Sequence, residues 1–149
     1  MSKLQALIID DHTSVRQALA KRLTNTDQIE VRATAGTLTE AMTVVQAHQP
    51  DVVILGLRVL DHNRDVTQII QLADRLKGWG AALVILTSYA VDEDRKALLK
   101  AGARRYLLKD IDTDKLLLEI NRAVTESFSY AKRPKRNFVL PDGELPNTL

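Results

Sequence analysis

The sequence predicts an α/β protein built on a doubly wound parallel sheet of five strands. Three observations lead to this prediction. Strand-like and helix-like patterns alternate five times between residues 4 and 127. Two of the strand-like runs, residues 52–55 and 82–86, are wholly apolar, which is typical of strands buried on both faces of a parallel sheet. Each strand is followed by a segment long enough for the helical crossover that joins parallel strands.

The first two predicted strands differ in their pattern of apolar residues, and this difference indicates the order of the strands in the sheet. Residues 6–9 are apolar and end at two aspartates, and apolar residues then recur at helical spacing. Ser14 and Gln17 are spaced as a capping box for that helix. Residues 29–35 alternate apolar and polar side chains, which indicates one solvated face and an edge position. An edge position for the second strand favours the strand order 2-1-3-4-5.

The middle of the chain continues the alternation of predicted helices and strands. Thr37 and Glu40 form a second capping box, before a helix that reaches about His48. The central strand, residues 52–55, is expected to break at Gly56. The third helix is expected to place one apolar face on the core, formed by Val66, Ile69, Ile70 and Ala73.

The last two units complete the pattern. A turn at residues 77–80 precedes the buried fourth strand. The fourth helix covers about residues 92–101 and is expected to end at Gly102, because glycine commonly terminates helices. The fifth strand, residues 106–108, leads into Lys109 and then into a final amphipathic helix.

Composition limits the class of protein. The chain has 149 residues, 45% of them apolar, which is enough for one domain with a sizeable core. It has no cysteine, so disulfides and thiolate metal sites are excluded. The start of the chain lacks the pattern of a signal peptide. No apolar run approaches the roughly 18–20 residues that span a bilayer. A soluble cytoplasmic protein without a membrane partner is therefore expected.

Residues 1–128 are predicted to form one domain, and residues 129–149 a flexible basic tail that contains proline. Of the 21 basic and 19 acidic residues, four basic and two acidic ones lie from Ala131 onward, which leaves 17 of each before it. Such a neutral body does not suggest a platform for nucleic acid. The basic cluster at residues 132–136 is interpreted as a solvated linker remnant, because no DNA-binding domain is expected after it.

Chemically distinctive positions fall at the carboxyl ends of four predicted strands. They are Asp10 and Asp11 after the first strand, Gly56 at the third, Thr87 after the fourth and Lys109 after the fifth. The carboxyl ends of parallel strands meet at one edge of the sheet, so these positions are expected to share one crevice. Two adjacent carboxylates suit a hard divalent cation such as Mg²⁺. A hydroxyl and an ammonium suit the oxygens of a phosphoryl group.

With these residues at its strand ends, the chain resembles the receiver domain of two-component response regulators, which has a CheY-like, flavodoxin-like fold. The chain is most similar to the class that precedes a LuxR/NarL-type helix-turn-helix domain. The resemblance extends over about residues 4–126. It rests on five stretches in the expected order, at residues 7–12, 49–55, 83–89, 101–103 and 106–110.

The resemblance implies a role for each position in the crevice. Asp10 and Asp11 match the pair that binds Mg²⁺. An aspartate at the position of Gly56 would accept a phosphoryl group from a histidine kinase. Thr87 matches the hydroxyl that contacts this phosphoryl group, and Lys109 matches the ammonium that pairs with it.

Two further features follow from the resemblance. Tyr106 matches an aromatic that turns inward on activation, although a half-buried strand aromatic explains this residue equally well. In the family, the surface of the fourth helix, fifth strand and fifth helix often forms the output or dimer face.

The chain departs from the family at the decisive position. Gly56 has no carboxylate, so the usual aspartyl phosphate cannot form. Residues 59–64 also differ from the family's usual loop, which favours a natural degenerate receiver over a single engineered change. Asp10, Asp11 and Lys109 together leave a formal charge of −1, so Lys109 is expected to bridge to the acid pair without a metal. Mg²⁺ binding is therefore expected to be weak, and no cofactor is required.

The leading hypothesis is a pseudo-receiver of two-component signalling that acts through phosphorylation-independent protein contacts. Its partner would be a histidine kinase, another regulator or a second copy of the chain. One alternative is a receiver-like domain that senses a small molecule or anion beside Thr87 and Lys109. Another is a truncated transcription regulator whose basic tail contacts DNA, although nucleic acid is the less favoured partner. An enzyme is not expected, because the crevice offers no nucleophile with a base beside it.

Overall fold

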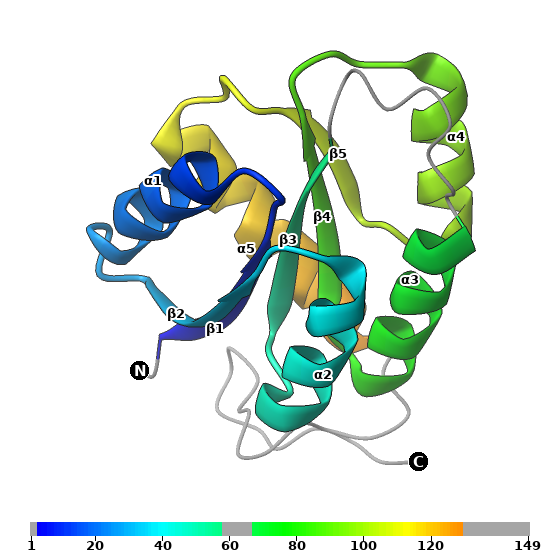
Figure 1. Ribbon diagram of the computed structural model, residues 1–149, viewed down its shortest axis with the longest axis horizontal. Coiled ribbons are helices and arrows are strands. Elements are labelled where there is room, and N and C mark those ends of the chain that lie inside the picture. The colour runs from blue at the N-terminus through cyan, green and yellow to red at the C-terminus, as the bar shows by residue number, and fades with distance from the viewer. Residues whose placement is uncertain (1–2, 58–66, 130–149) are drawn as a thin grey trace.

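The computed structural model describes residues 3–57 and 67–129 (Figure 1). These residues alternate strictly between strand and helix. In chain order the elements are β1 (Leu4–Ile9), α1 (Thr13–Thr24), β2 (Ile29–Ala35), α2 (Leu38–His48), β3 (Val52–Leu57), α3 (Thr67–Trp79), β4 (Ala82–Thr87), α4 (Asp92–Ala101), β5 (Arg105–Leu108) and α5 (Thr113–Ser129).

The five strands form one parallel sheet in the order β2-β1-β3-β4-β5. Helices α1 and α5 cover one face of the sheet, and α2, α3 and α4 cover the other (Figure 1). The predicted fold class and strand order are confirmed. The edge position of β2 follows from its alternation, because Ile29 and Ala35 are buried while Glu30, Arg32 and Thr34 are exposed.

The central strands are buried on both faces, as their apolar runs predicted. Alternate residues of β1 and β3 belong to two separate cores. Leu7 and Leu55 lie in the core under α2, α3 and α4, and Ile8 and Ile54 lie in the core under α1 and α5. Each fully buried aliphatic side chain contributes about 1.5–3 kcal/mol to folding. This two-sided burial holds the strand ends, and thus the crevice, in fixed relative positions.

The predicted break of the central strand at Gly56 is wrong. Strand β3 continues through Gly56 to Leu57, and Gly56 pairs in register with Leu86 of β4. Glycine weakens a strand through its backbone entropy but keeps the main-chain groups that pair with a neighbouring strand. Gly56 therefore lies inside the sheet rather than in a loop.

The helix ends show one wrong and two correct predictions. Helix α1 begins at Thr13 with His12 as its N-cap, so the capping box at Ser14 is wrong. At α2 the Thr37 hydroxyl accepts a hydrogen bond from the Glu40 amide at 3.1 Å, as predicted. Helix α4 ends at Gly102 with φ of +124°, a conformation that side chains other than glycine rarely adopt.

The buried face of α3 differs from the prediction by a small rotation. Ile69 and Ala73 are buried as expected, but Leu72 and Leu76 join them, while Ile70 is 39% exposed. The helix carries apolar residues on more than one face, so spacing alone did not fix which stripe is buried.

Val66 and residues 59–64 lie outside the described residues, as do residues 130–149 of the predicted tail. Among the described helices, none has the length and hydropathy needed to cross a membrane.

Candidate functional site

The sheet brings the predicted site positions to one edge. Ile9 pairs in register with Leu55, so Asp10 lies beside Gly56. Thr87 pairs with Leu108, and the Lys109 amide donates to the Thr87 carbonyl oxygen at 2.8 Å. Residues from β1, β3, β4 and β5 thus meet where the strands end, as expected for an open α/β sheet.

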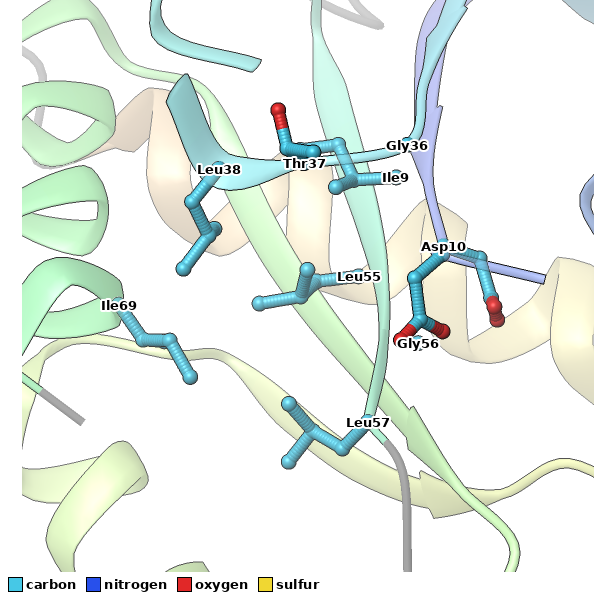
Figure 2. Close-up of a pocket in the computed structure, with 10 residues that line it drawn as sticks. Ile9, Asp10, Gly36, Thr37, Leu38, Leu55, Gly56, Leu57 and Ile69 are labelled. Carbon is cyan, nitrogen blue, oxygen red and sulfur yellow. The ribbon is translucent and has the colours of Figure 1, made fainter. Parts of the chain in front are cut away.

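The Asp10 carboxylate occupies the space above Gly56 (Figure 2). A Cβ atom built on Gly56 would lie 2.0 Å from Asp10 Oδ2 and 2.8 Å from its Cγ. Non-bonded carbon and oxygen atoms do not approach this closely. Asp10 is only 4% exposed. The position that a side chain at residue 56 would fill is therefore taken by a carboxylate from the neighbouring strand.

Both oxygens of the Asp10 carboxylate have donors. Lys109 Nζ lies 3.0 Å from Oδ2, and the His12 amide donates to Oδ1 at 2.9 Å. At about 4 Å and an effective dielectric of about 20, two unit charges attract by about 4 kcal/mol, and desolvation cancels a large part of this for a buried pair. Of the expected bridge from Lys109 to the acid pair, the structure shows the contact with Asp10.

The two acids of the pair face different environments. Asp10 is buried and bound to Lys109, whereas Asp11 is exposed at the start of the turn into α1. A joint cation site needs both carboxylates to converge. The Asp10 carboxylate lies against Gly56 of β3 and pairs with Lys109, which follows β5.

The Thr87 hydroxyl is engaged within its own loop. It donates to the Tyr89 carbonyl oxygen at 3.0 Å and accepts from the Tyr89 amide at 3.3 Å. Thr87 is 3% exposed. This pattern closes a local turn after β4, as Ser and Thr hydroxyls often do.

Tyr106 is half-buried and connects β5 to the beginning of α4. Its ring packs against the core under α2, α3 and α4. Its hydroxyl accepts a hydrogen bond from the Val91 amide at 3.2 Å, and Val91 is the N-cap residue of α4. This arrangement fits a strand aromatic with a satisfied hydroxyl, and it also fits a side chain that reports on the position of α4.

Sequence reasoning missed Arg16 and Gly36. Arg16 Nη1 donates to the main-chain carbonyl oxygen of Asp10 at 2.6 Å. A Cβ atom on Gly36 would lie 2.9 Å from this same nitrogen, so Gly36 leaves room for the guanidinium. The only sequence signal was an arginine one turn into the helix after the acid pair. Its contact could not be predicted, because every residue has a main-chain oxygen and no side-chain pattern marks the one that is bound.

Arg22 fixes the loop that follows Lys109. Its Nε donates to the Thr113 hydroxyl at 2.7 Å, and its guanidinium also donates to the Ile111 carbonyl oxygen. Thr113 is the first residue of α5. The loop between β5 and α5 is therefore attached both to α1 and, through Lys109, to Asp10.

A charged cluster joins β5 to α5 away from the crevice. Arg105 Nε lies 2.6 Å from Glu119 Oε2, and Arg105 Nη2 lies 2.7 Å from Glu126 Oε2. Hydrogen bonding from Arg105 lowers the pKa of Glu126, and the same bond raises the pKa of Arg105. The cluster holds the edge strand against the last helix.

The described residues do not fit the Mg²⁺ that the resemblance implies. Mg²⁺ requires near-octahedral oxygen ligands. Within residues 3–57 and 67–129, no group of three or more His, Cys, Asp or Glu side chains is arranged to hold a metal. Both Asp10 oxygens already accept hydrogen bonds, one of them from a cation.

A small pocket lies beside the crevice (Figure 2). Its volume is about 170 Å³. Its lining includes the apolar side chains of Leu38, Leu55, Leu57 and Ile69. The two acids also line it, together with Ile9, Gly36, Thr37 and Gly56. The pocket is thus largely separate from Lys109.

Comparison with known proteins identifies the family. Residues 6–121 match the model of the response regulator receiver domain, and the chain belongs to this family. The resemblance drawn from the sequence is confirmed. Receiver domains of this kind take part in two-component signal transduction.

Two bacterial relatives show the class more closely. The chain is 36% identical over 125 residues to the nitrate/nitrite response regulator protein homolog of Haemophilus influenzae, covering 80% of this chain and 56% of the relative. It is 34% identical over 123 residues to the DNA-binding transcriptional activator DevR/DosR of Mycobacterium tuberculosis, covering 83% and 54%. The chain thus spans about half the length of these relatives. Both names describe regulators, and the second includes DNA binding, so the expected exclusion of nucleic acid is not supported.

A solved structure agrees with the fold. The receiver domain of the putative response regulator NarL from Mycobacterium tuberculosis superposes with a TM-score of 0.68 at 20% identity, covering 85% of this chain and 98% of that one. At this identity the likeness concerns the fold alone.

Proposed function

We propose that the protein is a pseudo-receiver, which signals by protein contact and without phosphorylation. The observation that carries the proposal is the position of Asp10 Oδ2, 2.0 Å from where a Cβ at residue 56 would stand. Position 56 supplies no carboxylate, and the space of that side chain is filled. The usual aspartyl phosphate therefore has neither its acceptor nor its room.

The contacts of Lys109 support the same proposal. In a receiver that is phosphorylated, the lysine pairs with the phosphoryl group according to the family resemblance. Here Lys109 pairs with Asp10 at 3.0 Å. A carboxylate within the chain thus supplies the negative charge that Lys109 needs. We infer that the loop after β5 keeps one arrangement, independent of a phosphodonor.

The partner in this proposal is a protein, which binds the surface formed by α4, β5 and α5. Large apolar side chains are exposed around this surface, with Tyr89 66%, Val91 40%, Leu108 44% and Leu118 49% exposed. These side chains offer apolar area to a protein partner that covers this surface. The candidates are a histidine kinase, another response regulator and a second copy of this chain, and the protein would compete with phosphorylated receivers for them.

The test of the central proposal is the intact mass after incubation with Mg²⁺ and a small phosphodonor. We expect no adduct on this chain. A labile adduct on the Gly56→Asp variant, which restores an acceptor, would show that the Asp10 carboxylate can leave the space it fills above position 56. Absence of an adduct on both proteins would show that the pocket has lost more than its acceptor. An adduct on the unmodified chain would overturn the proposal.

A small-molecule sensor is the second candidate function, and the 170 Å³ pocket is the observation in its favour. The expected anion site beside Thr87 and Lys109 is less well supported, since the hydroxyl and the ammonium both have partners. A ligand carried through purification and seen by native mass spectrometry would favour this candidate.

A DNA-binding regulator is the third candidate, because the name of one relative includes DNA binding. Salt-dependent DNA binding that disappears when residues 131–149 are deleted would support it.

We further propose that the chain is not itself an enzyme and that it acts in the cytoplasm. The first point rests on the described crevice, where Thr87 bonds its own loop and has no general base beside it.

A further inference from the structure

Two glycines flank Asp10, and a charged group occupies the space of each missing side chain. Above Gly56 the space holds the Asp10 carboxylate, with Oδ2 2.0 Å from the ideal Cβ position. Above Gly36 it holds the guanidinium of Arg16, with Nη1 2.9 Å from the ideal Cβ position. Both glycines thus make room for groups that contact or belong to Asp10.

These contacts bring the formal charge around the acid pair to zero. Asp10 and Asp11 carry two negative charges. Lys109 bonds the Asp10 carboxylate at 3.0 Å, and Arg16 bonds the Asp10 carbonyl oxygen at 2.6 Å. A divalent cation gains most from negative charge that nothing else neutralises. The chain itself supplies the neutralising charge at this site.

We propose that Arg16 and Lys109 serve as built-in counter-cations of the Asp10–Asp11 pair, in the place of Mg²⁺. Arg16 acts as a positioning residue, because it holds the main chain of Asp10 while Lys109 holds the carboxylate. The inference rests on the proposed function and deepens it, since it explains how the acid pair remains stable without a metal.

The test is a titration of the full chain with MgCl₂, followed by calorimetry and by thermal unfolding, with NaCl matched for ionic strength. We expect Mg²⁺ to leave the Tm of the wild-type protein within about 1 °C, since a ligand stabilises only in proportion to its binding. In the double variant Arg16→Ala/Lys109→Ala we expect Mg²⁺ affinity to rise by about tenfold or more.

Charge-retaining variants separate electrostatics from structure. Arg16→Lys and Lys109→Arg alter the hydrogen-bond geometry but keep the charge, so they are expected to gain no Mg²⁺ affinity. Arg32→Ala is the matched control, because Arg32 pairs with Glu30 on the exposed face of β2. Circular dichroism in EDTA shows whether each variant folds, and the two single alanine variants carry the test if the double one does not.

Three results would overturn the inference. One is strong stabilisation of the wild-type protein by Mg²⁺. Another is equal Mg²⁺ affinity in the wild-type protein and in the folded alanine variants. The third is a gain in the charge-retaining variants as large as in the alanine variants. Failure of the proposed function has a separate readout, which is a covalent adduct after treatment with the phosphodonor.

Discussion

Asp10 and Gly56 share one space at the carboxyl edge of the sheet. The Asp10 Oδ2 atom lies 2.0 Å from the position that a Cβ at residue 56 would occupy. The two residues are on neighbouring parallel strands, β1 and β3. Their relationship determines what any side chain at position 56 would do to the protein.

The first prediction concerns Gly56→Ala. Alanine normally stabilises an element interior relative to glycine by roughly 0.5–1 kcal/mol. Here we expect the opposite sign, a loss of about 1–3 kcal/mol, because the new methyl group forces Asp10 off Lys109. Urea denaturation measures the change.

Gly78→Ala is the matched control for this prediction. A Cβ on Gly78, in α3, meets no atom within 4 Å. Alanine is therefore expected to stabilise the protein there by roughly 0.5–1 kcal/mol. If both substitutions stabilise the protein, the contact between Asp10 and position 56 has no energetic significance.

The second prediction concerns Lys109→Met. Removal of the ammonium leaves the Asp10 carboxylate buried without its counter-charge, and we expect a loss of about 1–3 kcal/mol in the free energy of unfolding. Lys96→Met is the control, because Lys96 is 74% exposed on α4 and pairs with Asp92. Its expected effect is within about 0.5 kcal/mol. Equal effects of the two substitutions would count against the ion pair as a stabilising contact.

The third prediction concerns pH. The hydrogen bond from Arg105 lowers the pKa of Glu126 from its ordinary value of 4.5. A lowered folded-state pKa means that the contribution is full above the unfolded-state value and disappears as the pH falls through the folded-state value. Because Glu126 is 44% exposed, we expect this contribution to be less than about 1 kcal/mol.

Urea midpoints of the wild-type protein and of Glu126→Gln test this pH dependence. We expect the urea midpoints of the two proteins to differ at pH values above the ordinary pKa of a glutamate and to become equal in acid. Glu30→Gln, in an exposed pair with Arg32 on β2, is the control. A constant difference between wild type and Glu126→Gln at every pH would show that titration of Glu126 is not coupled to folding.

The fourth prediction concerns Tyr106→Phe. Loss of the hydroxyl removes the acceptor of the Val91 amide, so we expect a loss of about 0.5–1.5 kcal/mol and a shifted amide resonance for Val91. Tyr89→Phe is the control, since Tyr89 is 66% exposed. An unchanged Val91 resonance in Tyr106→Phe would contradict the hydrogen bond.

The sequence predicted the fold well because the spacing of apolar residues along each segment indicates its secondary structure and which of its faces are buried. Alternation across β2 predicted its edge position, and the apolar runs predicted β3 and β4 as central strands. The site positions at the strand ends followed from the fold. A contact of Lys109 with the acid pair was expected from the strand-end positions and the formal charge of −1, but these did not show that Asp10 is the acid it binds.

Other features depended on contacts that residue types do not reveal. Arg16 bonds a main-chain oxygen, and any residue supplies such an acceptor. Gly56 was interpreted as a break because it ends the apolar run of residues 52–55, yet the strand continues through it and its missing side chain leaves room for Asp10. The buried stripe of α3 was rotated because Ile70 and Leu72 fit the helical period equally well, and only tertiary packing chooses between them.

The most direct test of the account is a double-mutant cycle between Gly56→Ala and Asp10→Ala, measured by urea denaturation. If Asp10 fills the space of residue 56, Gly56→Ala destabilises the wild-type protein but becomes neutral or stabilising once Asp10 is alanine. The expected coupling is at least about 1 kcal/mol. If Gly56→Ala has the same effect in both backgrounds, Asp10 does not occupy that space, and the structural basis for a phosphorylation-independent receiver is contradicted.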